Sequence, residues 1–306
     1  MSKISVIILN WNGENDTIDC INSLLNQVDV ELDIMVIDNG SKKESVSKIE
    51  RKFPQIIVIK SEFNLGYCGG MNLGIRMAIK KDAKFFLLIN NDTVADKNFV
   101  KILMENFEDD VGVVGPIIYY YDDPNEIWSS GGKISPIIQE LSRSHKHQLE
   151  IPTKPIDLDF ITGCAMLVKR EVFEKVGFFD ERFFPAYYED LDFCLRVRKA
   201  GYRIILDPTS LLWHKVSKSS NGSESENLIF LVARNSGFYF RKHLKLWNFL
   251  PIICYRLLSG IKKTIFWSVQ KKITLIKAYW CGFFVGWTGK SFKCQKHYME
   301  FYSKSS

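Results

Sequence analysis

Residues 85–94 read FFLLINNDTV, an uninterrupted apolar run that ends in two asparagines, an aspartate and a threonine. A short apolar run bounded by turn residues is typical of a strand buried on both faces of a sheet. The pattern recurs upstream, where such runs alternate with segments of helical periodicity. The expected strands are 4–9, 33–37, 56–59 and 85–89, and the expected helices are about 15–27, 44–53 and 70–80. This alternation predicts an α/β fold, a Rossmann-like and mostly parallel sheet with helices on both faces.

The second half of the chain is less regular. We expect a helix over 96–107, a strand over 111–114, a polar loop over 139–155, a strand from Phe160 to Lys169 and a helix from Glu189 to Lys199. With 306 residues and 46% hydrophobic content, the chain can bury a large core. We divide it into a domain at 1–216, with halves at about 1–115 and 116–216, a linker or lid at 217–226, and a helical segment at 227–306.

Positive charge and aromatic residues are concentrated in the C-terminal segment. Residues 227–306 hold 14 of the 41 lysines and arginines and 18 of the 41 aromatic residues, against one acid, Glu300. Two apolar stretches, 246–258 and 273–287, are shorter than the ~20 residues that span a bilayer, and they contain Arg256 and Lys277. This mixture favours an amphipathic, membrane-associated helical segment. A helical cap packed on the first domain is the alternative.

The cysteines and the N-terminus bear on the compartment. Seven cysteines are scattered singly, without a CxxC pair, and their odd number argues against a complete disulfide framework. The apolar run after Met1 is too short for the core of a signal peptide and fits a first buried strand. A reducing, cytosolic setting is therefore expected. A nucleic-acid partner is not expected, because the basic segment is aromatic and aliphatic and does not form a polar groove.

Polar turns follow the ends of the expected strands. Ligands of open α/β sheets bind beyond the carboxyl ends of the strands, so 10–13, 38–41 and 90–93 should line one cleft. Asp92 would there present a carboxylate to a divalent cation, Mg²⁺ or Mn²⁺, which needs only one or two protein carboxylates when it is bound to a diphosphate. Taken alone, the Asn-Asn-Asp-Thr sequence is equally a turn that caps the next helix.

A glycine-rich stretch lies between the second and third of these turns. In SEFNLGYCGGMNLGI, residues 61–75, four glycines lead into a helix, which allows the backbone to approach a bound anion. The spacing fits neither a Walker loop nor a dinucleotide fingerprint, so ATP hydrolysis and NAD binding are weak candidates.

The most informative chemistry lies in residues 187–214. Glu189 and Asp190 open a helix, where an acid can serve as a general base, and His214 ends the following strand, where it can hold a metal. A purely structural role for Asp190 is the alternative, since an acid at a helix N-terminus interacts favourably with the helix dipole by about 0.3–1 kcal/mol. Two adjacent acids are more than this role requires, which favours a catalytic role. Glu189 is the weaker candidate for the base.

Six motifs in this order resemble the family 2 glycosyltransferases of the GT-A fold, in particular bacterial rhamnosyltransferase-like members. They cover roughly residues 3–216, and any one of them alone would be weak. The motifs are SVIILNWNG, VIDNGS, NLGYCGGMNLG, LLINNDT, TGCAMLVKREVFEKVGFFDERFF and YYEDLDFCLRVRKAGY.

The resemblance implies roles for particular residues. Asp38 and the backbone of Asn10, Trp11 and Asn12 would hold the nucleoside, with Asn64 and Gly66 beside it. Asp92 corresponds to the last acid of the family's metal motif, whose first acid is replaced by Asn90. His214 would complete the metal site, and Asp190 matches the general base, with Glu189 orienting the acceptor or the loop.

The resulting expectation is an inverting, metal-dependent glycosyltransferase. Its donor would be a dTDP- or UDP-linked sugar, with rhamnose as one candidate. Its acceptor would be a surface glycan on a polyprenyl diphosphate, and the enzyme would lie peripherally on the cytoplasmic face of the cell membrane. Two alternatives stay open: a hexosyltransferase acting on a soluble glycan or protein, and a non-catalytic module of the same fold that binds nucleotide sugars.

Overall fold

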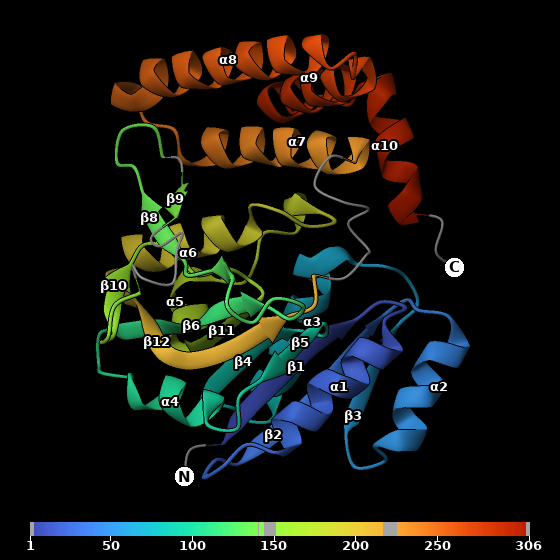
Figure 1. Ribbon diagram of the computed structural model, residues 1–306, viewed down its shortest axis with the longest axis vertical. Coiled ribbons are helices and arrows are strands. Elements are labelled where there is room, and N and C mark those ends of the chain that lie inside the picture. Colours follow the sequence, from blue (N-terminus) through green and yellow to red (C-terminus); the bar gives the residue numbers. More distant parts are fainter. Residues whose placement is uncertain (1–2, 140, 144–150, 217–224, 304–306) are drawn as a thin grey trace.

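A computed structural model gives the structure of the protein and describes residues 3–139, 141–143, 151–216 and 225–303 (Figure 1). The expected linker at 217–226 lies almost wholly outside the described residues. The first half contains β1 (Ile4–Asn10), α1 (Glu14–Leu25), β2 (Leu32–Asn39), α2 (Lys43–Lys52), β3 (Ile57–Ser61), α3 (Gly66–Lys80), β4 (Phe85–Asn90), β5 (Thr93–Ala95), α4 (Phe99–Glu105) and β6 (Val111–Tyr120).

The second half adds short strands, three helices and one long strand. In chain order these are β7 (Ile127–Ser129), β8 (Gly132–Ile134), β9 (Leu141–Arg143), β10 (Ile156–Leu158), β11 (Ala165–Lys169), α5 (Arg170–Val176), a 3₁₀ turn (Glu181–Phe183), α6 (Glu189–Lys199) and β12 (Arg203–His214). The C-terminal segment contains α7 (Glu226–His243), α8 (Leu246–Val269), α9 (Ile273–Thr288) and α10 (Lys293–Ser303).

The main sheet confirms the α/β class and is mixed. Its order is β10-β12-β6-β11-β4-β1-β2-β3, with β5 paired to β12 and β7 to β6. Strands β4, β1, β2 and β3 are parallel, as the alternation predicts, and so are β6 and β12. Strand β11 runs antiparallel between β4 and β6. The two parallel groups are therefore joined by one reversed strand.

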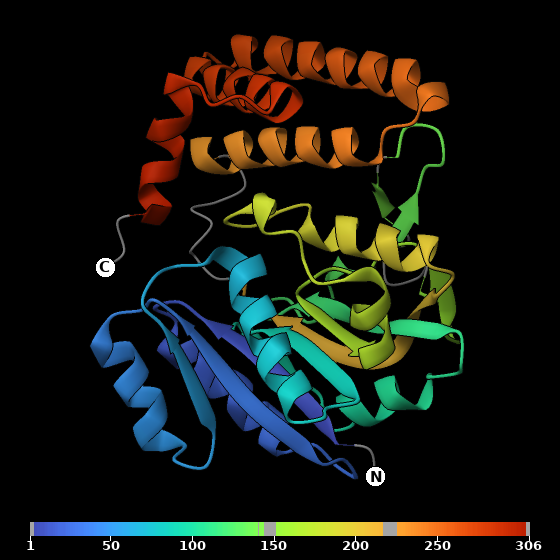
Figure 2. The same ribbon diagram turned by 180° about the vertical axis from the view of Figure 1, so that it is seen from behind.

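Successive side chains along the strands are buried on opposite faces of the sheet. Ile7 and Phe86 belong to one core cluster, which includes side chains of α3, α5 and α6, whereas Ile8 and Leu87 belong to another with α1, α2 and α4. Helix α1 accordingly lies in front of the sheet in Figure 1, and α3 lies in front of it in Figure 2. The apolar strands are continuous in sequence because both of their faces are covered.

Two sequence expectations need correction in the second half. The strand expected from Phe160 begins only at Ala165, because the backbone N–H of Gly163 donates to the Asp190 carboxylate at 3.0 Å and does not join a ladder. The loop expected at 139–155 contains β9, which pairs antiparallel with β8. Residues 144–150 of that loop lie outside the described part of the chain.

The C-terminal segment forms a helical layer against the domain. Helix α7 lies between α6 and the pair α8 and α9 (Figure 1). Helices α7 and α9 pack backbone to backbone, because a Cβ on Gly282 or Gly286 would collide with the carbonyl oxygens of Phe230 and Arg234. The two expected stretches correspond to the start of α8 and to α9. The inner side of the segment is thus packed on the first domain, which was the alternative to a membrane-associated segment.

Helix α8 buries two polar side chains together with Ile252 and Trp267, and it leaves most of its other large apolar side chains exposed. Asn248 and Arg256 are buried, and Arg256 donates to Ser236 of α7 at 2.7 Å. In the described part of the chain, none of the helices combines the length and the apolar character needed to cross a bilayer. The outward side chains of α8, each more than 40% exposed, are Leu246, Trp247, Phe249, Leu250, Leu257, Leu258, Ile261, Ile265, Phe266 and Val269.

One disulfide was not expected from the sequence. Cys281 of α9 and Cys294 of α10 are bonded, with their Cα atoms 6.3 Å apart. The other five cysteines are free thiols. The pair escaped the sequence analysis because the two residues are 13 positions apart, and only the turn between the two helices brings them together.

Candidate active site

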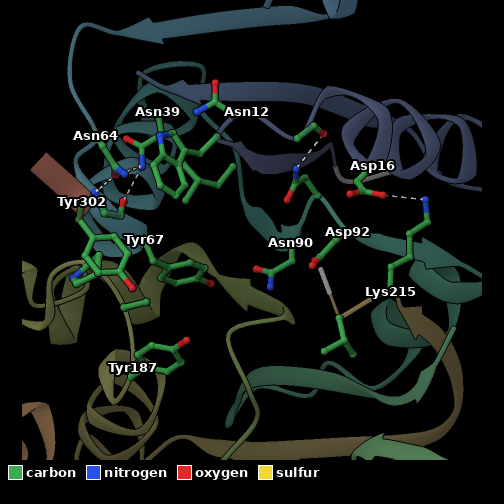
Figure 3. Close-up of a pocket in the computed structure, with 18 of the residues that line it drawn as sticks. Asn12, Asp16, Asn39, Asn64, Tyr67, Asn90, Asp92, Tyr187, Lys215 and Tyr302 are labelled. Carbon is green, nitrogen blue, oxygen red and sulfur yellow. Dashed lines mark hydrogen bonds and ion pairs between the residues drawn. The ribbon is translucent and has the colours of Figure 1, made fainter. Parts of the chain in front are cut away.

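A cavity of about 820 Å³ opens beyond the carboxyl ends of β1, β2 and β4 (Figure 3). Its position is that expected for a ligand site in an open α/β sheet. It is lined by Leu9, Trp11, Asn12, Gly13, Asp16, Asn39, Asn64, Gly66, Tyr67, Asn90, Asn91, Asp92, Asp122, Pro185, Ala186, Tyr187, Lys215, Val216 and Tyr302.

Amide side chains and a glycine form one end of the cavity. Asn39 donates to Asn64 Oδ1 at 3.0 Å and to the carbonyl oxygen of Gly66 at 3.1 Å. Gly66 has a φ of +70°, and a Cβ there would lie 2.7 Å from Phe184 and 2.8 Å from the Pro185 carbonyl oxygen. Only glycine therefore allows the start of α3 to approach this loop so closely. Of the expected nucleoside-binding residues, Trp11, Asn12, Asn64 and Gly66 line the cavity.

Asn10 and Asp38 lie behind the cavity wall. Asn10 is fully buried and donates to Asp38 Oδ1 at 2.9 Å and to Ser41 Oγ at 3.2 Å. Asp38, 2% exposed, also accepts from the backbone N–H of Ser41. These contacts tie the ends of β1 and β2 together. A direct contact of either residue with a nucleoside stays a prediction.

Asp92 lines the opposite end of the cavity, and His214, which is not among the lining residues, contacts Asp92 there. His214 Nε2 lies 3.1 Å from Asp92 Oδ1, and both side chains are buried. The Trp128 ring packs edge-on against the imidazole, with centroids 4.3 Å apart. Within the described residues the buried Nδ1 atom of His214 has no hydrogen-bond partner. The backbone N–H of Lys215 donates to the carbonyl of Asp92 at 2.8 Å and fixes the two segments together.

This end fits a divalent cation that is shared with a ligand. Among the described residues no group of three or more histidines, cysteines, aspartates or glutamates is arranged to hold a metal ion. Two donor atoms, Asp92 Oδ1 and His214 Nε2, nevertheless converge beside the cavity, with Asn90 on the same wall. A cation bound with a diphosphate takes its remaining ligands from phosphate and water, so two protein donors suffice.

Glu189 and Asp190 begin α6 but are not among the residues that line the cavity. Asp190 is half-buried and accepts backbone hydrogen bonds from Gly163 at 3.0 Å and Leu191 at 2.8 Å. A Cβ on Gly163 would lie 2.8 Å from the Tyr67 hydroxyl and 3.5 Å from Asp190 Cβ. Tyr67 itself lines the cavity. Asp190 therefore adjoins the cavity wall through Gly163 and Tyr67.

The two acids have different environments. Burial raises the pKa of Glu189 well above its usual value, and the neighbouring charge of Asp190 raises it further. Glu189 Oε2 is buried and has no hydrogen-bond partner in the part of the chain that the structure describes. Burial also raises the pKa of Asp190, but hydrogen bonds from the Gly163 and Leu191 backbone oppose the rise. Asp190 is thus the acid better able to carry negative charge.

The two expected reaction centres flank one buried thiol. Burial raises the pKa of Cys164 well above its usual value, and the charges of Asp92 and Asp190 both add to the effect. The Cys164 carbonyl accepts from the backbone N–H of Asn90 at 2.8 Å. The expected metal ligand follows the end of β4, and the expected base accepts from Gly163, the residue before Cys164.

Several cavity residues were missed by the sequence analysis. Lys215 forms ion pairs with Asp16 at 3.1 Å and Asp19 at 2.6 Å, and although burial opposes it, these hydrogen bonds raise the pKa of Lys215. Tyr187 and Tyr302 line the opposite side (Figure 3). The position of Lys215, next to the expected metal histidine, was the available signal. No local pattern pointed to Tyr302, because α10 returns to the cleft only in the folded chain.

Helix α7 holds the loop that precedes the two acids. Asn235 Nδ2 lies within hydrogen-bond distance of three carbonyl oxygens, those of Phe183, Ala186 and Tyr187, at 2.8–3.1 Å. Tyr187 and Tyr188 have left-handed φ angles of 81° and 74°. Such a conformation is costly for non-glycine residues unless its surroundings hold it. The C-terminal segment therefore shapes the candidate active site.

A buried ion cluster joins α7 to α6. Asp192 is fully buried and lies within 2.9 Å of Arg196, Lys242 and His243. Burial alone would raise the pKa of Asp192, but the hydrogen bond from His243 and the positive charges of Arg196 and Lys242 outweigh it and lower that pKa. Burial lowers the pKa of His243. The cluster fixes the helix that begins with Glu189 against the C-terminal segment.

Comparison with known proteins agrees with this architecture. Residues 5–177 match the model of glycosyl transferase family 2. The chain is 28% identical over 241 residues to the low-salt glycan biosynthesis hexosyltransferase Agl10 of Haloferax volcanii, covering 77% of this chain and 74% of the relative. It is 23% identical over 277 residues to the N-acetylglucosaminyl-diphospho-decaprenol L-rhamnosyltransferase of Mycobacterium tuberculosis, covering 80% and 88%.

Solved structures show the same fold. GalNAc-T7 with UDP, GalNAc and Mn²⁺ aligns with a TM-score of 0.60 at 16% identity, covering 78% of this chain and 50% of that one. The mannosyltransferase PcManGT of Pyrobaculum calidifontis, in complex with GDP-Man and Mn²⁺, aligns with a TM-score of 0.56 at 13% identity, covering 97% and 79%. With a family match over more than half of its length, the chain belongs to glycosyl transferase family 2 and is a glycosyltransferase of the GT-A fold.

Proposed function

We propose that the protein is an inverting transferase that moves a sugar, with rhamnose the leading candidate, from a dTDP- or UDP-sugar to an acceptor hydroxyl. The observation that carries this proposal is that two centres lie at one cavity. Asp92 lines one wall and is bonded to His214 behind it, and Asp190 adjoins another wall. A single displacement needs a base on the acceptor side and charge neutralisation on the leaving-group side.

Asp190 is the proposed general base. It takes the proton of the acceptor hydroxyl while that oxygen bonds to the anomeric carbon and the bond from that carbon to the diphosphate breaks. The N–H groups of Gly163 and Leu191 orient its carboxylate. Because the attack occurs opposite the departing nucleoside diphosphate, the configuration at the anomeric carbon is inverted. Glu189, whose pKa is raised by burial, would support the loop.

Asp92 and His214 are the proposed holders of a Mg²⁺ or Mn²⁺ ion. When bound, such an ion neutralises the charge that develops on the departing diphosphate. Trp11, Asn12, Asn64 and Gly66 form the cavity end at which we place the nucleoside. Asn10 and Asp38 would act there mainly by fixing the ends of β1 and β2, since they are buried and bonded to each other.

The proposed acceptor is a surface glycan carried on a polyprenyl diphosphate. Two observations support it: the mycobacterial relative is named for a diphospho-decaprenol substrate, and α8 presents a continuous apolar face. Exposed apolar patches of this kind mark interaction surfaces. Lys245, Lys262 and Lys271 are exposed on or beside α8 and suit anionic lipid. We place the enzyme peripherally on the cytoplasmic face of the cell membrane, in cell-envelope polysaccharide synthesis.

A hexosyltransferase with another acceptor is the second candidate, favoured by the name and the 28% identity of the Haloferax relative. A panel of dTDP-, UDP- and GDP-sugars, assayed with Mn²⁺ and a prenyl-diphosphate-linked N-acetylglucosamine, separates the two by donor and acceptor.

The proposed base is tested with Asp190→Asn, which should abolish transfer and leave donor binding intact. Asp109→Asn, on an exposed turn, is the matched control. Transfer at the wild-type rate by Asp190→Asn would refute the proposed base. If the wild type bound donors but transferred from none of them, the non-catalytic alternative would replace the proposal.

A further inference from the structure

A second cavity, of about 560 Å³, lies where the C-terminal helices meet the catalytic domain. Four of its lining residues are cations. Arg182 lies in the 3₁₀ turn, and Arg234, Arg241 and Lys242 lie on α7. Phe184, Phe238 and Met299 supply apolar wall. Cationic groups next to an apolar wall form a site for a ligand that carries both an anionic and a hydrocarbon part.

Only part of this positive charge is balanced within the protein. Asp180 accepts from Arg182 at 2.6 Å and from Lys242 at 2.8 Å, and Lys242 also pairs with Asp192. Arg234 and Arg241 have no ion-pair partner among the described residues. This leaves two guanidinium groups of the cavity without a carboxylate.

The least exposed of these cations is built into the wall. Arg234 is 3% exposed, and its guanidinium donates to the carbonyl of Phe184 and to Asn235 Oδ1. Burial lowers the pKa of Arg234 to about 10, so it remains charged at neutral pH. Arg241 donates to the Gly286 carbonyl at 3.3 Å. A buried charge without a counter-ion is unfavourable, and an anionic ligand would relieve that cost.

The basic cavity and the candidate active site share two walls. Phe184 lines the basic cavity, and the next residue, Pro185, lines the active-site cavity. On α10, Met299 lines the basic cavity, and Tyr302, about one turn later, lines the active-site cavity. A ligand anchored in the basic cavity would therefore be next to the cleft in which transfer is proposed.

We propose that the basic cavity binds the diphosphate of a prenyl-diphosphate-linked acceptor, with the first isoprene units against Phe184, Phe238 and Met299. This inference rests on the proposed function and names the part of the protein that recognises its acceptor. Inorganic pyrophosphate and phospholipid headgroups share the phosphate chemistry, so the experiment must separate them from the prenyl diphosphate.

The test is calorimetric titration of the full chain with farnesyl diphosphate, without nucleotide or divalent cation. We expect saturable binding, and a Kd about tenfold weaker in Arg241→Gln and in Arg182→Gln, the usual effect of removing one charged hydrogen-bond donor. Arg51→Gln, which removes one exposed arginine from α2, is the matched control and should bind like the wild type. Two arginine variants are used so that loss of structure in one does not decide the result.

Three further ligands define the outcomes that would overturn the inference. If farnesol bound as tightly as farnesyl diphosphate, the diphosphate would not contribute to binding and the cavity would be only an apolar pocket. Equal affinity for inorganic pyrophosphate would assign it to a free phosphate ligand, and equal affinity for dihexanoyl phosphatidylglycerol would assign it to a lipid headgroup. Unchanged affinity in both arginine variants would place the ligand elsewhere.

The experiments can refute the acceptor site without refuting the proposed function, and the reverse. If the wild type transfers sugar to the lipid-linked acceptor and both arginine variants keep its KM, the basic cavity is not the acceptor site and the proposed function stands. If arginine-dependent farnesyl diphosphate binding is found but no nucleotide sugar serves as donor, the proposed function fails. Asp190→Asn should bind farnesyl diphosphate like the wild type.

Discussion

Nε2 of His214 lies 3.1 Å from Oδ1 of Asp92, although the two residues are 122 positions apart in the chain. Strand pairing sets this distance, because the antiparallel register of β12 and β5 places His214 opposite Thr93, the neighbour of Asp92. The edge-on contact of Trp128 then fixes the plane of the imidazole. Two donor atoms are thus brought together by the sheet before any ligand binds.

His214→Ala should weaken the use of Mn²⁺. Loss of one of two protein donors is expected to raise the Mn²⁺ concentration for half-maximal transfer by about tenfold or more. A Mn²⁺ titration of the transfer rate measures it. His297→Ala, an exposed histidine on α10, is the control and should match the wild type. Identical titrations for all three proteins would remove His214 from the metal site.

Glu189→Gln should stabilise the fold at neutral and alkaline pH. The pKa of Glu189 is raised in the folded protein, so the folded state keeps a proton that the unfolded chain releases. Stability from this group is present below the unfolded pKa of about 4.3 and is lost as the pH rises towards the folded pKa, by up to about 1.4 kcal/mol per pH unit.

Urea unfolding at pH 5, 6.5 and 8 measures this effect. The advantage of Glu189→Gln over the wild type should grow with pH across that range. Glu105→Gln, at the exposed end of α4, should show no such trend. A constant difference between Glu189→Gln and the wild type at all three pH values would contradict a raised pKa for Glu189.

Asn235→Ala should lower both stability and turnover. Three backbone carbonyls of the loop before α6 lose their donor, which is expected to cost about 2 kcal/mol in the free energy of unfolding. Because that loop leads into the proposed base, kcat should fall by about tenfold, while the KM for the donor changes little.

Asn106→Ala is the control for this variant. Asn106 bonds Asp207 and the Ile102 carbonyl near α4, away from the cavity, so its loss should lower stability without lowering kcat. Steady-state kinetics and urea unfolding of both variants separate the two effects. Equal kcat in the two variants would show that α7 only stabilises the fold.

Leu258→Glu should weaken binding to lipid. Leu258 is 66% exposed on the outward face of α8, and a buried charge in the bilayer interface is unfavourable. Co-sedimentation with vesicles containing phosphatidylglycerol at low salt should show a severalfold loss. Leu25→Glu changes a leucine that is 48% exposed on α1 and should sediment like the wild type. If the wild type fails to bind vesicles, the membrane proposal falls.

The parallel half of the fold was predictable because its signals are local. The strands Ile4–Asn10 and Phe85–Asn90 are apolar except for Ser5 and their terminal asparagines, and both faces of each strand prove to be buried. The start of α6 at Glu189 was also placed correctly. The late start of β11 was not, because the Gly163 N–H bonds a carboxylate 27 positions further along the chain.

The site was predictable only in part. Trp11, Asn12 and Asp92 line the cavity where the strand-end rule places them, whereas Asn10 and Asp38 proved to be buried ties between strands. Strand-end position shows which edge of the sheet a residue occupies. It does not show whether the side chain points into the cavity or into the wall.

Local sequence patterns were enough to predict the α/β class, the edge of the sheet that carries the cavity, and the helix that begins with Glu189 and Asp190. All three follow from the spacing of apolar residues and from the turn residues between the elements. Only the folded structure shows that α7 holds the loop before Asp190, that Tyr302 lines the cleft, and that Arg182 and Arg234 share a basic cavity. Those contacts join residues tens to hundreds of positions apart, and their geometry is set by how the helices pack, which no local pattern encodes.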